Sequence, residues 1–216
     1  MRQLQWMLEL LYPPKCVFCG RLLRKPEQDL CGKCRSALPE AEQSVRRGAY
    51  YTECHALYYY EENVAESVRR FKFSGMQHYA AAYGRLIAMR LLRERVSFDV
   101  LSWVPVSDRR RRKRGYDQTF LIAQSVAAEL GVPCVRTLRK IRHNQPQSLQ
   151  PDAAARHANV IGAYRAETPE TFQGKHVLLI DDVITTGATL TECSHTLRTA
   201  GAASVVCAVL AAARIQ

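Results

Sequence analysis

The sequence predicts an α/β fold, in which a mostly parallel sheet is flanked by helices and preceded by a small metal-binding module. Two observations support this prediction. From residue 100 onward, short apolar segments typical of buried strands alternate with segments of helical periodicity. Near the N-terminus, four cysteines form two C-x-x-C pairs. A chain of 216 residues, 47% of them hydrophobic, is long enough for one such domain and a short appendage.

The first twelve residues predict an amphipathic docking helix. The segment from Leu4 to Tyr12 is hydrophobic but contains Glu9, and it lacks the small-residue cleavage site of a secretory signal. No apolar stretch of the sequence reaches the roughly 20 residues that a membrane-spanning helix needs. We therefore expect a protein without a membrane span.

Residues 13–38 predict a zinc-binding module. Pro13 and Pro14 end the preceding helical pattern, since proline lacks an amide hydrogen. The cysteines that follow have the spacing C-x2-C-x11-C-x2-C, which lets two tight turns present four thiolates to one zinc ion. Such a closed site is structural, and metal binding supplies the folding free energy that a unit of about 25 residues lacks. The predicted ligands are Cys16, Cys19, Cys31 and Cys34.

Two disulfides or a redox-active pair are the alternatives for these cysteines. The distribution of all eight cysteines favours the reducing cytoplasm, which argues against disulfides. Cys134, Cys193 and Cys207 are expected to be small core residues. Cys54, with His55 beside it, leaves open whether a second metal site exists.

The polar residues 39–48 predict a linker, and the larger domain is expected over residues 49–216. Within this domain the period of the apolar residues distinguishes helices from strands. The expected strands cover residues 56–60, 100–106, 132–135, 177–180 and 204–211, and the expected helices cover residues 77–95, 117–130 and 189–200.

The segment from Val177 to Thr189 gives the most specific functional signal. Four apolar residues predict a buried strand, and Asp181 and Asp182 follow at its carboxyl end, where open α/β sheets place their ligands. Ionised acids beside a core are costly unless they meet donors or a cation. We therefore expect both acids to face the hydroxyls of a ligand or a metal-bound ligand.

A turn of small residues follows the two acids and leads into a helix. The first amides of that helix have no partner within it and lie at the positive end of its dipole, which suits a phosphate. Acids for a sugar diol beside amides for a phosphate predict a receptor for ribose 5-phosphate. The alternative is a solvated strand end before an ordinary helix cap. The predicted phosphate-binding residues are Thr185, Thr186, Gly187, Ala188 and Thr189.

A basic segment from Arg109 to Arg114 places six consecutive cations after the strand expected to end at Val106. Together with the net charge of +11, it predicts affinity for polyanions, either phosphorylated small molecules or nucleic acid. The alternative is a charge run that is simply solvated. Phe71, Tyr116 and Phe120 offer stacking surfaces for single-stranded bases, although aromatic residues at such positions are more often part of the core.

Residues 140–160 form a long polar segment without helical or strand periodicity, which favours a functional lid over a plain connector. A lid that closes over a ligand excludes water from it. The candidate lid residues are Arg142, Gln145, Gln147 and Arg156.

The thirteen residues from Val177 to Thr189 resemble the motif with which type I phosphoribosyltransferases bind phosphoribosyl pyrophosphate (PRPP). The resemblance implies a type I phosphoribosyltransferase-like fold, in which Asp181 and Asp182 are the catalytic acids that hold the ribose hydroxyls and the loop holds the 5-phosphate. In that family PRPP binds with Mg²⁺, and the loop after the first core strand binds pyrophosphate. The resemblance therefore implies pyrophosphate contacts from Val106, Ser107, Arg109, Arg112 and Arg114.

Most of residues 10–212 resemble the ComF/GntX family, which is associated with competence and DNA uptake. The resemblance implies Mg²⁺-dependent phosphoribosyl transfer from PRPP to an unidentified acceptor. It also implies an alternative, a non-catalytic protein of the competence machinery that binds PRPP and single-stranded DNA. The oligomeric state is not fixed by the sequence, which is compatible with a dimer. The shared features are the zinc ribbon of paired cysteines, Arg70 to Gly75, Val104 to Val106, Arg114 to Gln118, Gln145 to Leu149, Arg156 to Ala163 and the phosphate loop.

Overall fold

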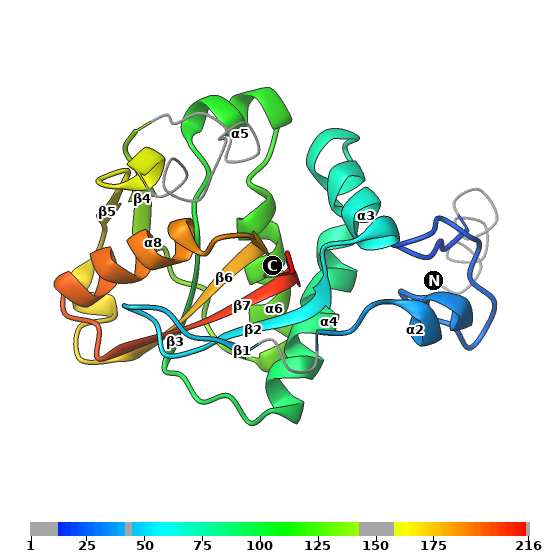
Figure 1. Cartoon of the computed structure of the whole chain (residues 1–216), viewed down its shortest axis with the longest axis horizontal. Helices are drawn as coiled ribbons and strands as arrows, with labels where there is room; N and C mark the ends of the chain where they lie inside the picture. The colour runs from blue at the N-terminus through cyan, green and yellow to red at the C-terminus, as the bar shows by residue number, and fades with distance from the viewer. Residues whose placement is uncertain (1–12, 42–44, 143–157, 215–216) are drawn as a thin grey trace, which may run out of the picture.

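The computed structural model describes residues 13–41, 45–142 and 158–214 of the chain (Figure 1). At the centre of these described residues lies a five-stranded sheet, in which four strands are parallel and the short first strand is antiparallel to its neighbour. In sheet order the strands are β1 (Val45–Arg46), β2 (Cys54–Tyr59), β7 (Ser204–Ala212), β6 (His176–Ile184) and β3 (Val100–Trp103).

Helices cover both faces of the sheet, which confirms the predicted architecture. In Figure 1, α3 and α8 lie on opposite sides of the sheet. One face is covered by α3 (Glu62–Phe73), α4 (Tyr79–Arg93) and α6 (Gln118–Leu130), and the other by α8 (Ala188–Thr199) with the antiparallel strands β4 (Leu138–Lys140) and β5 (Tyr164–Ala166).

Side chains of β6 alternate between two hydrophobic clusters, because successive residues of a strand point to opposite faces. Leu178 and Ile180 pack with α3, α4 and α6. Val177 and Leu179 pack with α8 and β5. Strand β6 is thus buried on both faces, as its run of apolar residues predicts.

The strand β6 is longer than predicted. It continues to Ile184 because β7 pairs with it along its whole length, with Asp181 opposite Val209 and Ile184 opposite Ala212. The two acids therefore lie within the strand, not after it.

The basic segment forms a helix, α5 (Asp108–Arg114), where a loop was expected. The Ser107 side chain accepts a hydrogen bond from the Arg110 N–H at its start, and Gly115 ends it with a φ of +84°. A run of cations has no apolar face, so hydrophobic periodicity could not predict this helix.

Three other segments differ from the expectation. Helix α3 was not predicted, although Val64, Val68 and Phe71 recur at helical spacing and are buried. Residues 132–135 make a single parallel bridge, from Cys134 to Leu101, because Pro133 has no N–H for a longer ladder. The expected linker 39–48 contains β1.

Residues 39–41 also lie along β2, so this segment is part of the sheet edge rather than a free linker. The Ala41 N–H donates to the Leu57 carbonyl at 2.9 Å, and the Tyr59 N–H donates to the Pro39 carbonyl at 2.8 Å. This pairing attaches the N-terminal module directly to the sheet.

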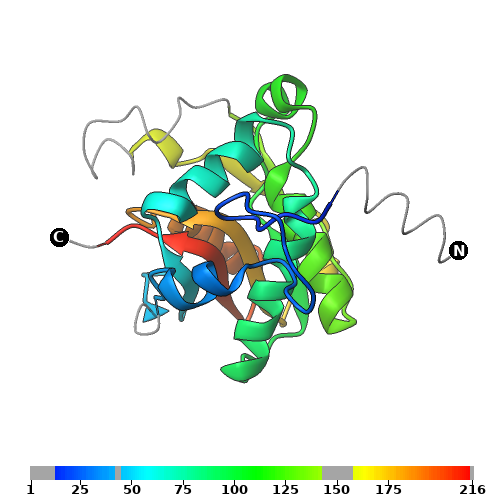
Figure 2. The same cartoon turned by 90° about the vertical axis from the view of Figure 1, so that its right-hand side faces the viewer.

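The N-terminal module consists of a turn, a bridge between Lys15 and Leu22, and the short helix α2 (Gly32–Ala37). Figure 2 views the molecule from the side on which this module lies. Its Phe18 ring is fully buried between Tyr58 of β2 and Tyr83 of α4, at centroid distances of 5.3 and 6.1 Å. The predicted helix of residues 1–12 lies outside the described residues. None of the described helices is long and apolar enough to cross a bilayer.

Candidate metal centre and sugar-phosphate pocket

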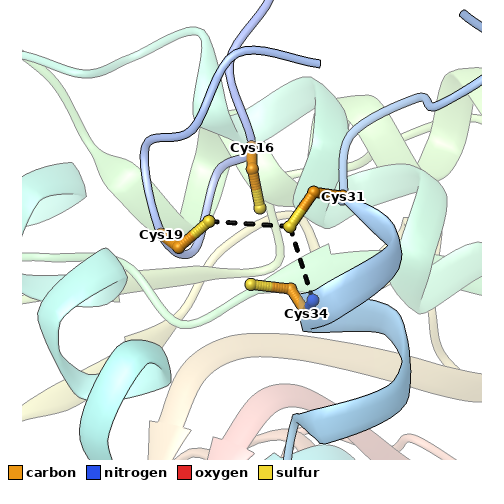
Figure 3. A group of neighbouring side chains, drawn as sticks. All are labelled: Cys16, Cys19, Cys31 and Cys34. Atoms are coloured by element: carbon orange, nitrogen blue, oxygen red, sulfur yellow. Dashed lines mark hydrogen bonds between the residues drawn. The ribbon is translucent and has the colours of Figure 1, made fainter. Parts of the chain in front are cut away.

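The four cysteines of the module converge on one point (Figure 3). Their sulfur atoms all lie within 4.8 Å of one another, and the Cys19 and Cys31 sulfurs are 3.6 Å apart. Four thiolates at about 2.3 Å from a tetrahedral zinc ion have sulfurs about 3.8 Å apart, so the cluster fits zinc. Cys16, Cys31 and Cys34 are buried, which suits a closed structural site.

The thiol of Cys31 ionises more readily than an ordinary cysteine thiol. Burial opposes its ionisation, but the Cys34 N–H, which donates to its sulfur at 3.4 Å, and the neighbouring thiols outweigh burial and lower its pKa to about 7. A thiolate is the form that binds metal. All eight cysteines are free thiols, so the disulfide alternative does not describe this structure.

Within the described part of the chain, Cys54 and His55 gather no further ligands for a second metal site. Cys54 is fully buried in β2, and the His55 ring lies between Glu94, whose carboxylate is 2.5 Å away, and Glu53, at 3.5 Å. Among the described residues, the four-cysteine cluster is the one group of three or more side chains with metal-ligating geometry.

A pocket of about 1050 Å³ opens where β3 and β6 end. Its walls are the loop before α8, one side of α5, the last turn of α3 and the β4–β5 pair. The predicted ligand-binding residues that line it are Asp181, Asp182, Thr185, Thr186, Gly187, Ala188, Thr189, Val106, Arg109 and Arg114.

The two acids lie side by side on β6 but have different neighbours. Asp182 is buried, and its carboxylate accepts hydrogen bonds from the Lys72 ammonium at 2.8 Å and the Gln118 amide at 3.3 Å. Asp181 is the preceding residue of the strand, so its side chain leaves the opposite face of the sheet. Its charge interacts with both Lys72 of α3 and Lys140 of β4.

Asp181 and Lys140, which both line the pocket, have strongly shifted pKa values. Burial, followed by the nearby Asp182 carboxylate, raises the pKa of Asp181 to about 8, although the Asp182 N–H and Lys72 act against this. Burial, followed by repulsion from Arg110, lowers the pKa of Lys140 to about 8. Asp181 therefore takes up a proton more readily than a free carboxyl group, and a cation or a hydrogen-bond donor that approaches it favours the charged form.

The loop that precedes α8 has the geometry of an anion site. Gly187 stands directly before the helix with a φ of +81° and has no side chain that could cap it. The Thr186 hydroxyl accepts one long hydrogen bond, from the Ala188 N–H at 3.4 Å. A β-carbon at this position would lie 3.1 Å from the Tyr51 hydroxyl, so the backbone is closely packed here. Thr185 and Thr186 are exposed, and the Arg46 guanidinium donates to the Thr185 carbonyl, which ties the loop to β1.

One side of α5 lines the pocket. Residues 109, 110, 113 and 114 recur at the i, i+1, i+4, i+5 spacing of a single helix face, and all four contact the pocket. Arg111 and Arg112 are exposed on the other face, where Arg111 pairs with Asp108 at 3.2 Å. Arg112 is thus not among the pocket residues, whereas Arg110 and Lys113 are.

Other predicted site residues have structural roles or lie elsewhere. Ser107 caps α5, and the Val106 N–H donates to the Asp117 carboxylate at 3.2 Å. Arg142 donates to the Ile161 carbonyl at 3.1 Å. Gln145, Gln147 and Arg156, and most of the expected lid, lie outside the described residues.

The three aromatic residues considered for base stacking belong to the core or its margin. Phe71 and Tyr116 are buried, and the Tyr116 hydroxyl donates to the Phe71 carbonyl. Phe120 is half-buried and packs on Trp103 at a centroid distance of 4.8 Å. The interpretation as core residues is therefore the right one for Phe71 and Tyr116.

Several pocket residues were missed. Lys72 lies within the segment from Arg70 to Gly75, which carries part of the family resemblance. That resemblance was the one sign in the sequence that Lys72 could belong to the site. Lys140 comes from the start of the expected lid, where its burial could not be foreseen. The residues missed are Lys72, Arg110, Lys113, Lys140 and Tyr164.

Comparison with known families gives two matches. The family described as Phosphoribosyl transferase domain matches residues 117–216. The family described as Double zinc ribbon domain matches residues 7–45, where this chain has four cysteines, all in the cluster described above.

Individual proteins similar to this chain carry names related to DNA use. The DNA utilization protein YhgH of Salmonella typhimurium is 31% identical over 204 residues, which cover 88% of this chain and 86% of that protein. Competence protein F of Haemophilus influenzae is 28% identical over 195 residues, which cover 87% and 80%. The solved glutamine PRPP amidotransferase from B. subtilis is 26% identical, with a TM-score of 0.44, and the match covers 62% of this chain but only 26% of that chain.

The identity to YhgH extends over most of both chains. The zinc cluster lies within the residues that match the zinc ribbon family, and the phosphoribosyltransferase motif lies within those that match the other family. The parallel sheet covered by helices is the type I phosphoribosyltransferase fold that this motif implies. The chain therefore belongs to the ComF/GntX family of phosphoribosyltransferase-like proteins with an N-terminal zinc ribbon.

Proposed function

We propose that the pocket binds PRPP together with Mg²⁺ and that the protein transfers the phosphoribosyl group to an acceptor. The observation that supports this most directly is the joint position, in one pocket, of a carboxylate pair and a helix that begins at a glycine. Carboxylates are acceptors for the two ribose hydroxyls, and the amides at the start of α8 are donors for the 5-phosphate.

The charges that line the pocket suit a ligand with several phosphates. Six cationic side chains face two acids, a formal excess of four positive charges. A sugar monophosphate leaves most of this charge unused, whereas a pyrophosphate beside α5 uses it. The six cations are Lys72, Arg109, Arg110, Lys113, Arg114 and Lys140.

In the proposed reaction the bond between the anomeric carbon and pyrophosphate breaks, and a bond from that carbon to the acceptor forms. The cations of α5 neutralise the leaving pyrophosphate, and Asp181 and Asp182 hold the ribose while positive charge develops at the anomeric carbon. Carboxylate and phosphate oxygens are the ligands that Mg²⁺ prefers, and the ion would add charge neutralisation at the pyrophosphate. The acceptor is not assigned.

Calorimetric titration with PRPP and Mg²⁺ tests the site. We expect Asp181→Asn combined with Asp182→Asn to abolish binding while the protein stays folded. The matched control is Glu66→Gln, which removes a partly exposed carboxylate of α3 outside the pocket. Unchanged affinity in the double variant would refute the assignment. Release of pyrophosphate in the presence of candidate acceptors separates catalysis from binding alone.

A second candidate function is a cytoplasmic role in DNA uptake with binding of single-stranded DNA. The names of the relatives, DNA utilization protein and competence protein, favour it, as does the net charge of +11. Exposed Arg111 and Arg112 are available for contacts to a phosphate backbone. Binding to a single-stranded oligonucleotide should weaken steeply as salt rises, and its absence at low salt would remove this candidate.

A further inference from the structure

Helix α3 contacts the zinc module on one side and the pocket on the other. In Figure 1, α3 stands between the N-terminal module and α5. Arg70 and Lys72 belong to its last turns and are two positions apart. Because a helix turns by about 100° per residue, side chains two positions apart point in nearly opposite directions. One helix segment thus reaches both sites.

On the module side, α3 binds the turn between the first two metal ligands. Val17 and Phe18 lie between Cys16 and Cys19. The Arg70 guanidinium donates to the Phe18 carbonyl at 2.5 Å and to the Val17 carbonyl at 3.2 Å. The Ser67 hydroxyl, which is fully buried, also donates to the Val17 carbonyl, at 2.5 Å. Both carbonyls belong to the loop that the metal would hold in shape.

On the pocket side, the same helix turn supplies a cation to an acid. The Lys72 ammonium is 2.8 Å from the Asp182 carboxylate, and 20% of the Lys72 side chain is exposed. The residue between the two cations, Phe71, is fully buried against Tyr83 at a centroid distance of 5.3 Å. A turn packed in this way moves as a unit, so a shift at Arg70 displaces Lys72.

We propose that Arg70 is a positioning residue through which the zinc-bound module holds Lys72 at Asp182, so that PRPP binds tightly only when the metal is present. This inference rests on the proposed function. Without metal, a module this small loses most of its folding free energy, and the two carbonyls that hold Arg70 are no longer fixed. Lys72 then leaves Asp182, and the pocket loses a preorganised cation.

Substitution of Arg70 tests this without removing the metal ligands. The variant Arg70→Met keeps the apolar stem but removes both hydrogen bonds to the turn. We expect it to retain zinc, measured by elemental analysis, and to bind PRPP with Mg²⁺ about tenfold more weakly in calorimetry. The matched control is Arg69→Met, the neighbouring exposed arginine of α3, which should leave both values unchanged.

A double-mutant cycle distinguishes positioning from general stability. If Arg70 acts through Lys72, then Arg70→Met should have almost no further effect on PRPP affinity in a Lys72→Met background. If the losses of PRPP-binding free energy caused by the two single substitutions add up in the double variant, the proposal is overturned. Removal of zinc with a chelator, followed by exchange into Mg²⁺ buffer, should weaken PRPP binding, and added zinc should restore it.

The two possible failures are distinguishable. If the wild-type, zinc-loaded protein does not bind PRPP, the proposed function fails and this inference fails with it. If the wild type binds PRPP and Arg70→Met binds it equally well, the pocket assignment stands and the link through α3 is refuted.

Discussion

The Lys72 ammonium lies 2.8 Å from the Asp182 carboxylate, although the two residues are 110 positions apart in the sequence. The pair joins the last turn of α3 to the centre of the sheet. Because Asp182 is buried, its carboxylate needs this partner before any ligand arrives. A ribose hydroxyl that binds there must share Asp182 with a cation already in position.

Asp181, on the neighbouring position of β6, should make stability fall as pH rises. Its pKa in the folded protein is raised from about 3.8 to about 8, so between these values the folded state keeps a proton that the unfolded state releases. The unfolding free energy therefore decreases with pH across this window. We expect Asp181→Asn to stabilise the protein by on the order of 2 kcal/mol at pH 8 and to have little effect below pH 4.

Urea unfolding at several pH values, without Mg²⁺ and without chelators, measures this effect. The control is Asp108→Asn, which replaces an exposed carboxylate of α5 outside the sheet. A stability difference for Asp181→Asn that does not grow with pH would contradict the raised pKa.

Replacement of Gly187 by alanine should harm both the fold and the phosphate site. The φ of +81° is strained for any L side chain, and the added β-carbon would lie 3.1 Å from the Tyr51 hydroxyl. We expect a loss of about 1–2 kcal/mol of stability and weaker binding of ribose 5-phosphate in calorimetry.

The matched control is Gly131→Ala, at the end of α6, where φ is +67° and a β-carbon would meet nothing within 4 Å. It should lose a similar amount of stability and keep its affinity for ribose 5-phosphate. If both variants bind equally, the loop before α8 is not the phosphate site.

The two faces of α5 should differ in what they bind. Arg109→Gln with Lys113→Gln removes two cations that line the pocket, and we expect pyrophosphate to bind at least about tenfold more weakly. Arg111→Gln with Arg112→Gln removes the same charge from the exposed face and should leave pyrophosphate binding unchanged. Equal losses in both variants would mean that only net charge matters.

The zinc cluster should hold one metal ion per chain and stabilise the module. Cys16→Ser combined with Cys19→Ser should abolish zinc in elemental analysis and lower the melting temperature, because metal binding supplies folding free energy. Cys134→Ala, which removes a half-buried thiol outside the cluster, should keep the zinc. Freshly purified wild-type protein without zinc would contradict the assignment.

The features that the sequence predicted well are local in the chain. The four cysteines form one site and the segment from Asp181 to Thr189 forms another, each from residues that are close in the sequence. Their spacing along the chain is therefore enough to predict that they come together. The sheet was likewise predictable, because the period of apolar residues reports which positions are buried. The extension of β6 to Ile184 could not be predicted in this way, since it depends on pairing with β7.

The features that were missed depend on contacts between distant segments. Lys72 reaches Asp182 only because α3 packs against the same face of the sheet as α6. The choice of Arg110 over Arg112 as a pocket residue depends on the phase of α5, which six similar cations cannot indicate. Ser107 and Gly115 were the available signs that a helix begins and ends there.

The position of β7 in the middle of the sheet affects how the protein is made. This strand pairs on both sides with segments that are synthesised earlier, and the contact between Thr52 and Val205 spans 153 positions. Until β7 has been synthesised, β2 and β6 cannot pair through it, and their edges stay unpaired. The zinc module, whose ligands span few residues, can bind metal long before that. We therefore expect late steps of sheet assembly to limit the folding rate and to be where chaperones act.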